Sequence, residues 1–116
     1  NELVTKAKLA PNVNVHGTAF AGSLYSIQAL TGWGMIHLQT RLLGLEASIL
    51  IAKGDIDYAS PVKADIVAVC RFDGHEEEQK LLIAEGKARF QLVCEVDIGG
   101  EIASTFRGSY AVKVKS

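Results

Sequence analysis

Residues 18–43 read TAFAGSLYSIQALTGWGMIHLQTRLL, and this stretch decides how the rest of the chain must fold. It is the longest segment without a strong breaker, and Arg41 is its sole charged residue. A helix from about Phe20 to the natural stop at Gly44 would be roughly 36 Å long. A helix that is apolar nearly all round must be buried on most of its sides. We therefore expect the remaining segments to wrap around it, with Gly32 and Gly34 allowing a close backbone approach or a bend.

The segments outside this helix alternate between apolar and polar residues, as half-buried strands do. We expect strands at 2–9, 47–58, 64–72, 87–97 and 101–115, a bulge at Gly54, a short helix at 75–84 and a hairpin turn at Gly99-Gly100. In the last strand, Ile102, Phe106 and Tyr110 share one parity and should face the same side. This order predicts an α+β fold, in which a curved antiparallel sheet of five strands wraps the long central helix. Residues 1–116 contain no repeat or linker, so we expect a single domain.

Composition excludes several classes of protein. The 116 residues can bury one core but not two, and 48% apolar with 22% charged residues excludes a disordered chain. Twelve basic and 13 acidic residues give a net charge of −1, which argues against a nucleic-acid or membrane-surface binder. Two cysteines are too few for a disulfide framework or a zinc site. We expect a cytoplasmic protein without a metal; the start at Asn1 leaves open whether a domain precedes it.

The polar loop before the long helix is the candidate site. Its polar side chains alternate and can converge; they are Asn12, Asn14, His16 and Thr18. Gly22 lets a ligand approach the backbone, and the free N–H groups at the helix start can polarise a carbonyl or bind an anion. Spacing alone favours the simpler interpretation, in which these side chains cap the helix and satisfy the loop.

Other residues with reactive or bulky side chains have simpler interpretations. We expect Trp33 to be buried and structural, because the small residues beside it leave room for its ring. His37 is interpreted as a hydrogen-bonded core histidine and His75 as a solvated one at a helix start. Cys70 and Cys94 share the parity of core residues, which predicts inert buried thiols.

The runs NVHGTAFAGSLYS at 14–26 and LTGWG at 30–34 resemble the YiiD-type thioesterase-like family. That family is a branch of the hot-dog fold and is sometimes attached to a GNAT acetyltransferase domain. Residues 58–65, YASPVKAD, are similar to the second-strand corner of hot-dog proteins. The resemblance implies a homodimer or a dimer of dimers. It also implies acyl-thioester chemistry at the dimer interface, with coenzyme A or acyl carrier protein as the carrier and no further cofactor.

The resemblance also implies roles for particular residues. Related thioesterases carry an Asp or Glu on the central helix, whereas residues 27–31 here read IQALT. For hydrolysis we expect His16 to act as general base, Asn14 to orient the water and the Gly22 and Ser23 N–H groups to form the oxyanion hole. The residues expected to contact substrate are Thr18, Phe20, Tyr58 and Pro61. Two alternatives stay open: a non-catalytic acyl-thioester binding module, and a dimerisation domain of a fused acetyltransferase.

Overall fold

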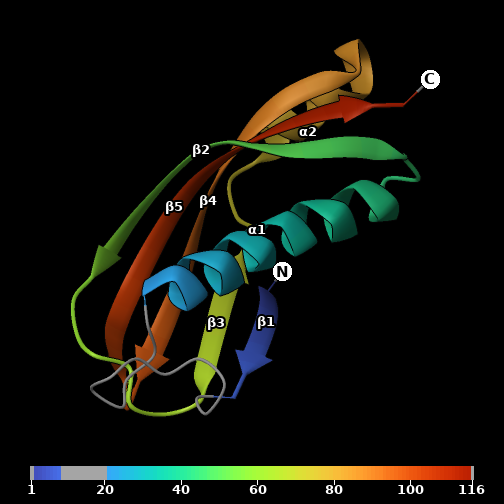
Figure 1. Ribbon diagram of the computed structural model, residues 1–116. Helices are drawn as coiled ribbons and strands as arrows, with labels where there is room; N and C mark the ends of the chain where they lie inside the picture. The colour runs from blue at the N-terminus through green and yellow to red at the C-terminus, as the bar shows by residue number, and fades with distance from the viewer. Residues whose placement is uncertain (1, 9–20, 116) are drawn as a thin grey trace.

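The computed structural model describes residues 2–8 and 21–115. Two helices and five strands follow one another in the predicted order (Figure 1). They are β1 (Glu2–Ala7), α1 (Ala21–Leu42), β2 (Ala47–Tyr58), β3 (Ile66–Arg71), α2 (Glu76–Glu85), β4 (Lys87–Ile98) and β5 (Glu101–Val114). The predicted α+β class is confirmed.

The five strands form one antiparallel sheet in the order β1-β3-β4-β5-β2. The sheet curls around α1, which contacts all five strands and lies in its concave side (Figure 1). This is the central helix in a curved sheet that the family resemblance implied. Both β1 and β2 are edge strands, so each leaves one row of backbone groups without a strand partner in the described chain.

The sheet-facing side of α1 is shaped by one phenol. The Tyr110 hydroxyl donates a hydrogen bond of 2.7 Å to the Ala29 carbonyl, and its ring packs where a side chain on Gly32 would sit. A Cβ on Gly34 would meet only the Leu3 side chain, at 3.0 Å. The predicted close approach at Gly32 is therefore made by a tyrosine side chain instead of by another backbone.

Two one-residue bulges interrupt the alternation. In β2 the register shifts at Ala52, so the bulge predicted at Gly54 is wrong; Gly54 lies under the Tyr25 and Phe106 rings instead. In β5 the register shifts at Ala103, which reverses the side on which the preceding residue points. Ile102 consequently faces outward and is 47% exposed, against the prediction that it shares a face with Phe106.

The two cysteines face each other on neighbouring strands. Cys70 on β3 pairs in register with Cys94 on β4, and both are fully buried, as predicted. The hydrogen bond between the thiols lowers the pKa of Cys70 and raises that of Cys94, and burial raises it further. Their position inside the core is that of small packing residues.

Candidate functional site

Of the eight predicted site residues, four lie outside the described residues: Asn14, His16, Thr18 and Phe20. Gly22 and Ser23 form the first turn of α1, where Gly22 is exposed and Ser23 is buried. Tyr58 ends β2 and Pro61 lies exposed in the connection that follows. The described residues thus include four of the predicted site residues, two at the start of α1 and two at the end of β2 and just after it.

The first turn of α1 contains two of the predicted site residues, Gly22 and Ser23. The N–H groups in the first turn of an α-helix have no carbonyl partner within the helix itself. The first turn carries no acidic residue, and the helix dipole adds a partial positive charge there. This end of α1 can stabilise negative charge on a bound carbonyl oxygen.

Directly after this turn, α1 and β2 line an open cavity of about 470 Å³, here called the helix-side cavity. Its lining comes from two turns of α1 and one residue of β2: Tyr25, Ser26, Ala29, Leu30, Trp33 and Ile51. The volume falls in the range of about 300–1,000 Å³ that is typical of small-molecule sites. The mostly apolar lining suits an alkyl or acyl group.

Trp33 and His37 differ from their predictions. Trp33 is half-buried and lines the helix-side cavity; its Nε1 donates to the Ile49 carbonyl at 3.4 Å. Its ring stacks on His37 at a centroid distance of 5.1 Å, and His37 is exposed. His37 is therefore not a core histidine, because it lies on the side of α1 that the sheet leaves open. His75 is half-buried against Phe72 and Phe90, and so is less solvated than expected.

Tyr25 brings a polar group to this mostly apolar cavity. Its ring meets Phe106 edge-on at 5.1 Å, and its hydroxyl lies over Gly54, where a side chain would collide with it. Tyr25 thereby contributes a hydroxyl-bearing ring to the lining of the helix-side cavity. The pKa of the exposed Tyr58 is raised, mainly by desolvation and in second place by the electrostatic influence of Tyr25.

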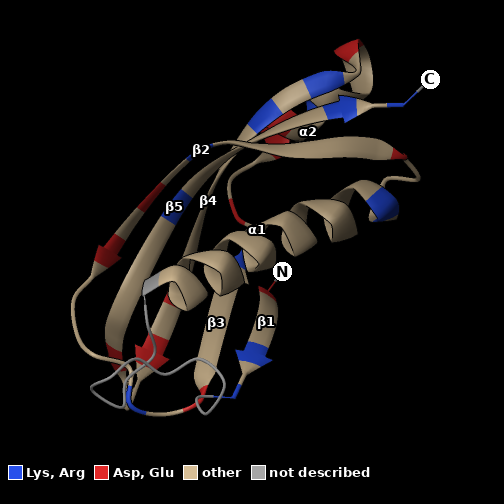
Figure 2. Cartoon of the chain, viewed as in Figure 1, with Lys and Arg blue, Asp and Glu red and all other residues tan. Residues whose placement is uncertain are grey.

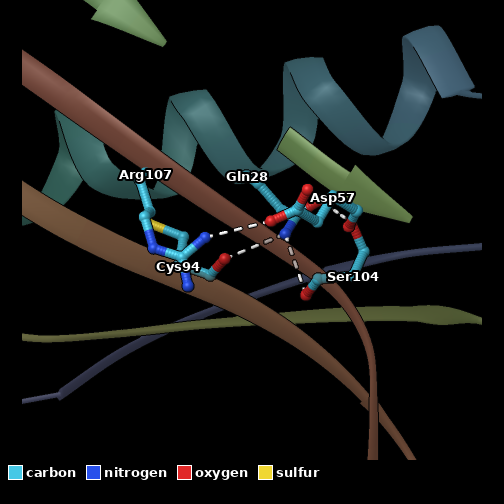
Figure 3. Close-up of polar contacts among 5 residues, drawn as sticks. All are labelled: Gln28, Asp57, Cys94, Ser104 and Arg107. Atoms are coloured by element: carbon cyan, nitrogen blue, oxygen red, sulfur yellow. Dashed lines mark hydrogen bonds and ion pairs between the residues drawn. The ribbon is translucent and has the colours of Figure 1, made fainter. Parts of the chain in front are cut away.

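Gln28 occupies the stretch of α1 where the family resemblance puts an acid, and it is fully buried. Its Nε2 donates to the Cys94 carbonyl at 2.9 Å and to the Ser104 carbonyl at 3.3 Å (Figure 3). The Ser104 hydroxyl lies 3.1 Å from both Gln28 Oε1 and the Asp57 carbonyl. This network ties α1 to three strands, which makes Gln28 a structural residue on the sheet side of the helix.

Asp57 and Arg107 lie at the outer edge of the same region. Arg107 Nη1 is 3.1 Å from Asp57 Oδ2, and both side chains are exposed (Figure 3). Exposed ion pairs contribute about 0–1 kcal/mol, so this one does not fix the site. Across residues 2–8 and 21–115, no group of His, Cys, Asp or Glu is arranged to hold a metal ion. No helix in that part of the chain is long and apolar enough to cross a membrane.

Sequence reasoning missed most of the lining of the helix-side cavity, although a signal exists. Gly22, Ser26 and Leu30 are spaced four residues apart, as are Tyr25, Ala29 and Trp33. Residues at this spacing lie one above another on a helix, so the two rows form adjacent stripes. The stripes begin at the end of the helix where we predict the oxyanion hole. This spacing could therefore have been used to predict a cavity beside that end of the helix.

The comparisons with known proteins agree with this geometry. A model of the family described as "Putative thioesterase (yiiD_Cterm)" matches residues 1–114. The chain belongs to this family. A crystal structure described as a "putative thioesterase" from Shewanella oneidensis is 37% identical, with a TM-score of 0.84 over 98% of this chain and 76% of that one. The predicted hot-dog fold and YiiD-type resemblance are thereby confirmed.

Two further structures show how widely the yiiD_Cterm fold is shared. A protein of unknown function from Chlorobaculum tepidum is 29% identical, with a TM-score of 0.90 over 99% of this chain and 78% of that one. A Bacillus halodurans protein solved with CoA is 16% identical, with a TM-score of 0.72 over 95% of this chain and 66% of that one. At that identity, the second likeness concerns the fold alone.

Proposed function

We propose that this protein hydrolyses acyl thioesters, with the acyl group in the helix-side cavity and the thioester carbonyl at the first turn of α1. One observation carries the proposal: a mostly apolar cavity of about 470 Å³ adjoins the first turn of α1, the part of a helix whose N–H donors lack a partner within the helix, and this turn carries no acid. An acyl chain needs the apolar lining, and a carbonyl that gains negative charge needs the donors. Coenzyme A as the carrier is supported by the related fold solved with CoA.

In the proposed reaction, water attacks the thioester carbon and the carbonyl oxygen becomes an oxyanion. Collapse of this intermediate breaks the carbon–sulfur bond, so the products are a carboxylic acid and the thiol of the carrier, which receives the proton taken from water. The Gly22 and Ser23 N–H groups stabilise the charge of the oxyanion, and such donors are typically worth about 10²–10³ in rate. Gln28 cannot take the proton from water, because it is an amide with its hydrogen-bonding groups occupied. We assign that step to His16, with Asn14 orienting the water, and with Thr18, Phe20, Tyr58 and Pro61 contacting the substrate.

The proposed active form is a homodimer, or a dimer of two such dimers. The helix-side cavity opens between α1 and the edge strand β2, and a second copy paired along β2 would close it. Leu30 is 60% exposed and Leu42 is 68% exposed on α1, which leaves apolar surface for that second copy to cover. The site is therefore complete in the dimer.

The test is turnover on a panel of acyl-CoA substrates of increasing chain length. We expect His16→Ala to lower kcat by about 10²–10⁴ and leave the melting transition nearly unchanged. The wild-type rate should rise with pH through about 6.5, the ordinary imidazole pKa. A wild-type rate in His16→Ala would end the general-base assignment, whereas a loss of about 1 kcal/mol in stability without a kinetic effect would indicate a cap.

The location of the acyl group is tested separately. Ile51→Ala enlarges the helix-side cavity, so we expect the preferred acyl chain to become longer than in the wild type. Val93→Ala is the matched control, because Val93 is exposed on the outer side of β4 away from this cavity. Saturable acyl-CoA binding without turnover would instead support the binding module, and neither binding nor turnover would support the dimerisation domain.

A further inference from the structure

A second cavity lies on the opposite side of the sheet from α1, at the end where α2 packs; it is here called the outer cavity. Its volume is about 520 Å³, and it is lined by three cations, one serine and five apolar residues. The cations are Lys87, Arg89 and Lys113, and the apolar residues include Leu50, Leu81 and Ala111. The alternation along β4 fixes the side, because Phe90 and Leu92 are buried toward α1 whereas Lys87 and Arg89 are exposed. The proposed thioester site uses none of these residues.

The three cations of the outer cavity are not neutralised within the described residues. Lys87 and Lys113 are direct cross-strand partners in the β4–β5 ladder, and Arg89 follows on the same side of β4. Like charges placed opposite each other destabilise a sheet. The ion pairs found among the described residues are made by Arg71 and Arg107, so none of these three cations has a carboxylate within ion-pair distance there.

Charge on this face is also segregated. Figure 2 shows Lys and Arg segments of β4 and β5 gathered at the α2 end of the sheet, although the whole chain carries a net charge of −1. The same strand β4 carries Glu95 and Asp97 toward its other end. The cations of β4 and β5 therefore give this end of the two strands a local positive charge, beside an α2 that carries Glu76, Glu77, Glu78 and Glu85.

Next to the cations, the outer cavity exposes apolar side chains. Leu50 is 68% exposed and Leu81 is 44% exposed, and Ala111 lies between Leu50 and Arg89 in the sheet register. A ligand that fits must carry an anionic head for the cations and an alkyl part for the leucines. A protein partner would need about 800 Å² of surface on each side, far more than a patch with two exposed leucines offers.

We propose that the outer cavity binds a fatty carboxylate, with its carboxylate on Lys87, Arg89 and Lys113 and its alkyl chain on Leu50 and Leu81. Charge-assisted hydrogen bonds from ammonium and guanidinium groups are the strong ones for a carboxylate. Such an acid is the class of product that thioester hydrolysis releases. That link to a source rests on the proposed function; the binding itself does not.

The experiment titrates the whole chain with dodecanoate below its micelle concentration and follows backbone amide signals by NMR. We expect saturable shifts at residues 87–89 and 111–113, and Lys87→Gln combined with Lys113→Gln should weaken binding at least about tenfold. Arg107→Gln is the matched control, because it removes a cation from the same face of β5 outside the outer cavity and should leave the affinity unchanged. Butyrate and a dodecyl ammonium ion should fail to bind, since each lacks one half of the ligand.

Removing two opposed lysines relieves repulsion, so the double variant should fold and keep its acyl-CoA turnover. Saturable shifts confined to α1 and Ile51, insensitive to the double variant, would overturn the proposal by placing dodecanoate in the helix-side cavity. No dodecanoate binding, with a sedimentation mass that falls in the double variant, would overturn it in favour of an interface between copies. The NMR titration measures binding and needs no turnover. A failure of the outer-cavity proposal can therefore be told apart from a failure of the proposed hydrolysis.

Discussion

At the scale of single residues, Gly32 and Tyr110 illustrate how one contact fixes the position of α1 on the sheet. The phenol enters the space that any other residue would fill, and its hydroxyl ends on the Ala29 carbonyl one turn earlier. A buried hydroxyl needs such a partner, since leaving it unpaired costs about 1–3 kcal/mol. The pair therefore specifies both the distance and the rotation of α1 over β5.

Gly32→Ala should destabilise the protein by about 2–4 kcal/mol, because the new methyl group displaces the Tyr110 phenol and breaks its hydrogen bond. Gly34→Ala is the matched control. It meets only the end of the Leu3 side chain and gains about 1 kcal/mol of helix propensity, so its net change should be small. Urea unfolding of both variants measures the difference, and equal stabilities would contradict the packing role of Gly32.

The raised pKa of Tyr110 leads us to expect that the protein loses stability in alkaline solution. Burial is the main cause that raises the pKa of Tyr110 well above its ordinary value, and the nearby Cys94 and Cys70 raise this pKa further. The unfolded chain then loses this proton near pH 10 while the folded chain keeps it, so stability falls by up to about 1.4 kcal/mol per pH unit above pH 10. Tyr110→Phe should lack this part of the decline, as measured by urea unfolding from pH 8 to 11. Tyr58→Phe, at an exposed position, should retain it.

At the scale of elements, Gln28 joins α1 to β4 and β5 through its amide. Gln28→Glu would direct a carboxylate at two carbonyl oxygens in the core, which costs about 3–5 kcal/mol at pH 7. Burial and those oxygens would raise the pKa of the new carboxyl, so the deficit should shrink below about pH 4.3, where the acid is protonated in both states. Unfolding at pH 4 and pH 7 tests this. Gln91→Glu at an exposed position of β4 should change little at either pH.

The elements themselves could be predicted from the sequence, because the long apolar helix and the alternating strands each carry a clear period. The two bulges could not, because one extra residue shifts the parity without changing the composition. Ile102 was misassigned for that reason. The open side of α1 was equally hidden, since a helix that is apolar nearly all round does not indicate which stripe the sheet leaves uncovered. Trp33 and His37 lie on that stripe.

For the candidate site, the sequence led us to predict residues at the start of α1 and at the end of β2, but it did not indicate the helix-side cavity. Ile51 is 38% exposed although its strand neighbours alternate regularly before the bulge. Its place in the helix-side cavity depends on how far the curled sheet carries β2 around α1, and no local pattern encodes that curvature. The outer cavity was missed for a similar reason, since Lys87 and Lys113 become neighbours only through the ladder register.

At the scale of the whole molecule, we expect a particle of at least twice 12.4 kDa in sedimentation experiments at micromolar concentration. Leu38→Glu should shift the mass towards that of a single chain, because Leu38 is exposed on the uncovered side of α1 and a charge there opposes burial. Val93→Glu places the same charge on the outer face and should leave a dimer intact. A mass near 12.4 kDa for the wild-type chain would refute the dimer.

The bulge at Ala52 limits how a strand of another molecule can pair with the free edge of β2. A bulge bends a strand and strengthens its twist, so the β2 of a second copy can pair on one side of Ala52, whereas a flat strand cannot lie straight along the whole edge. The opposite edge, β1, carries Glu2 and Lys6 as exposed charges, which discourage the same kind of addition. Strand-by-strand growth into fibres is thereby blocked at both ends of the sheet, so that concentrated solutions should stop at small closed particles.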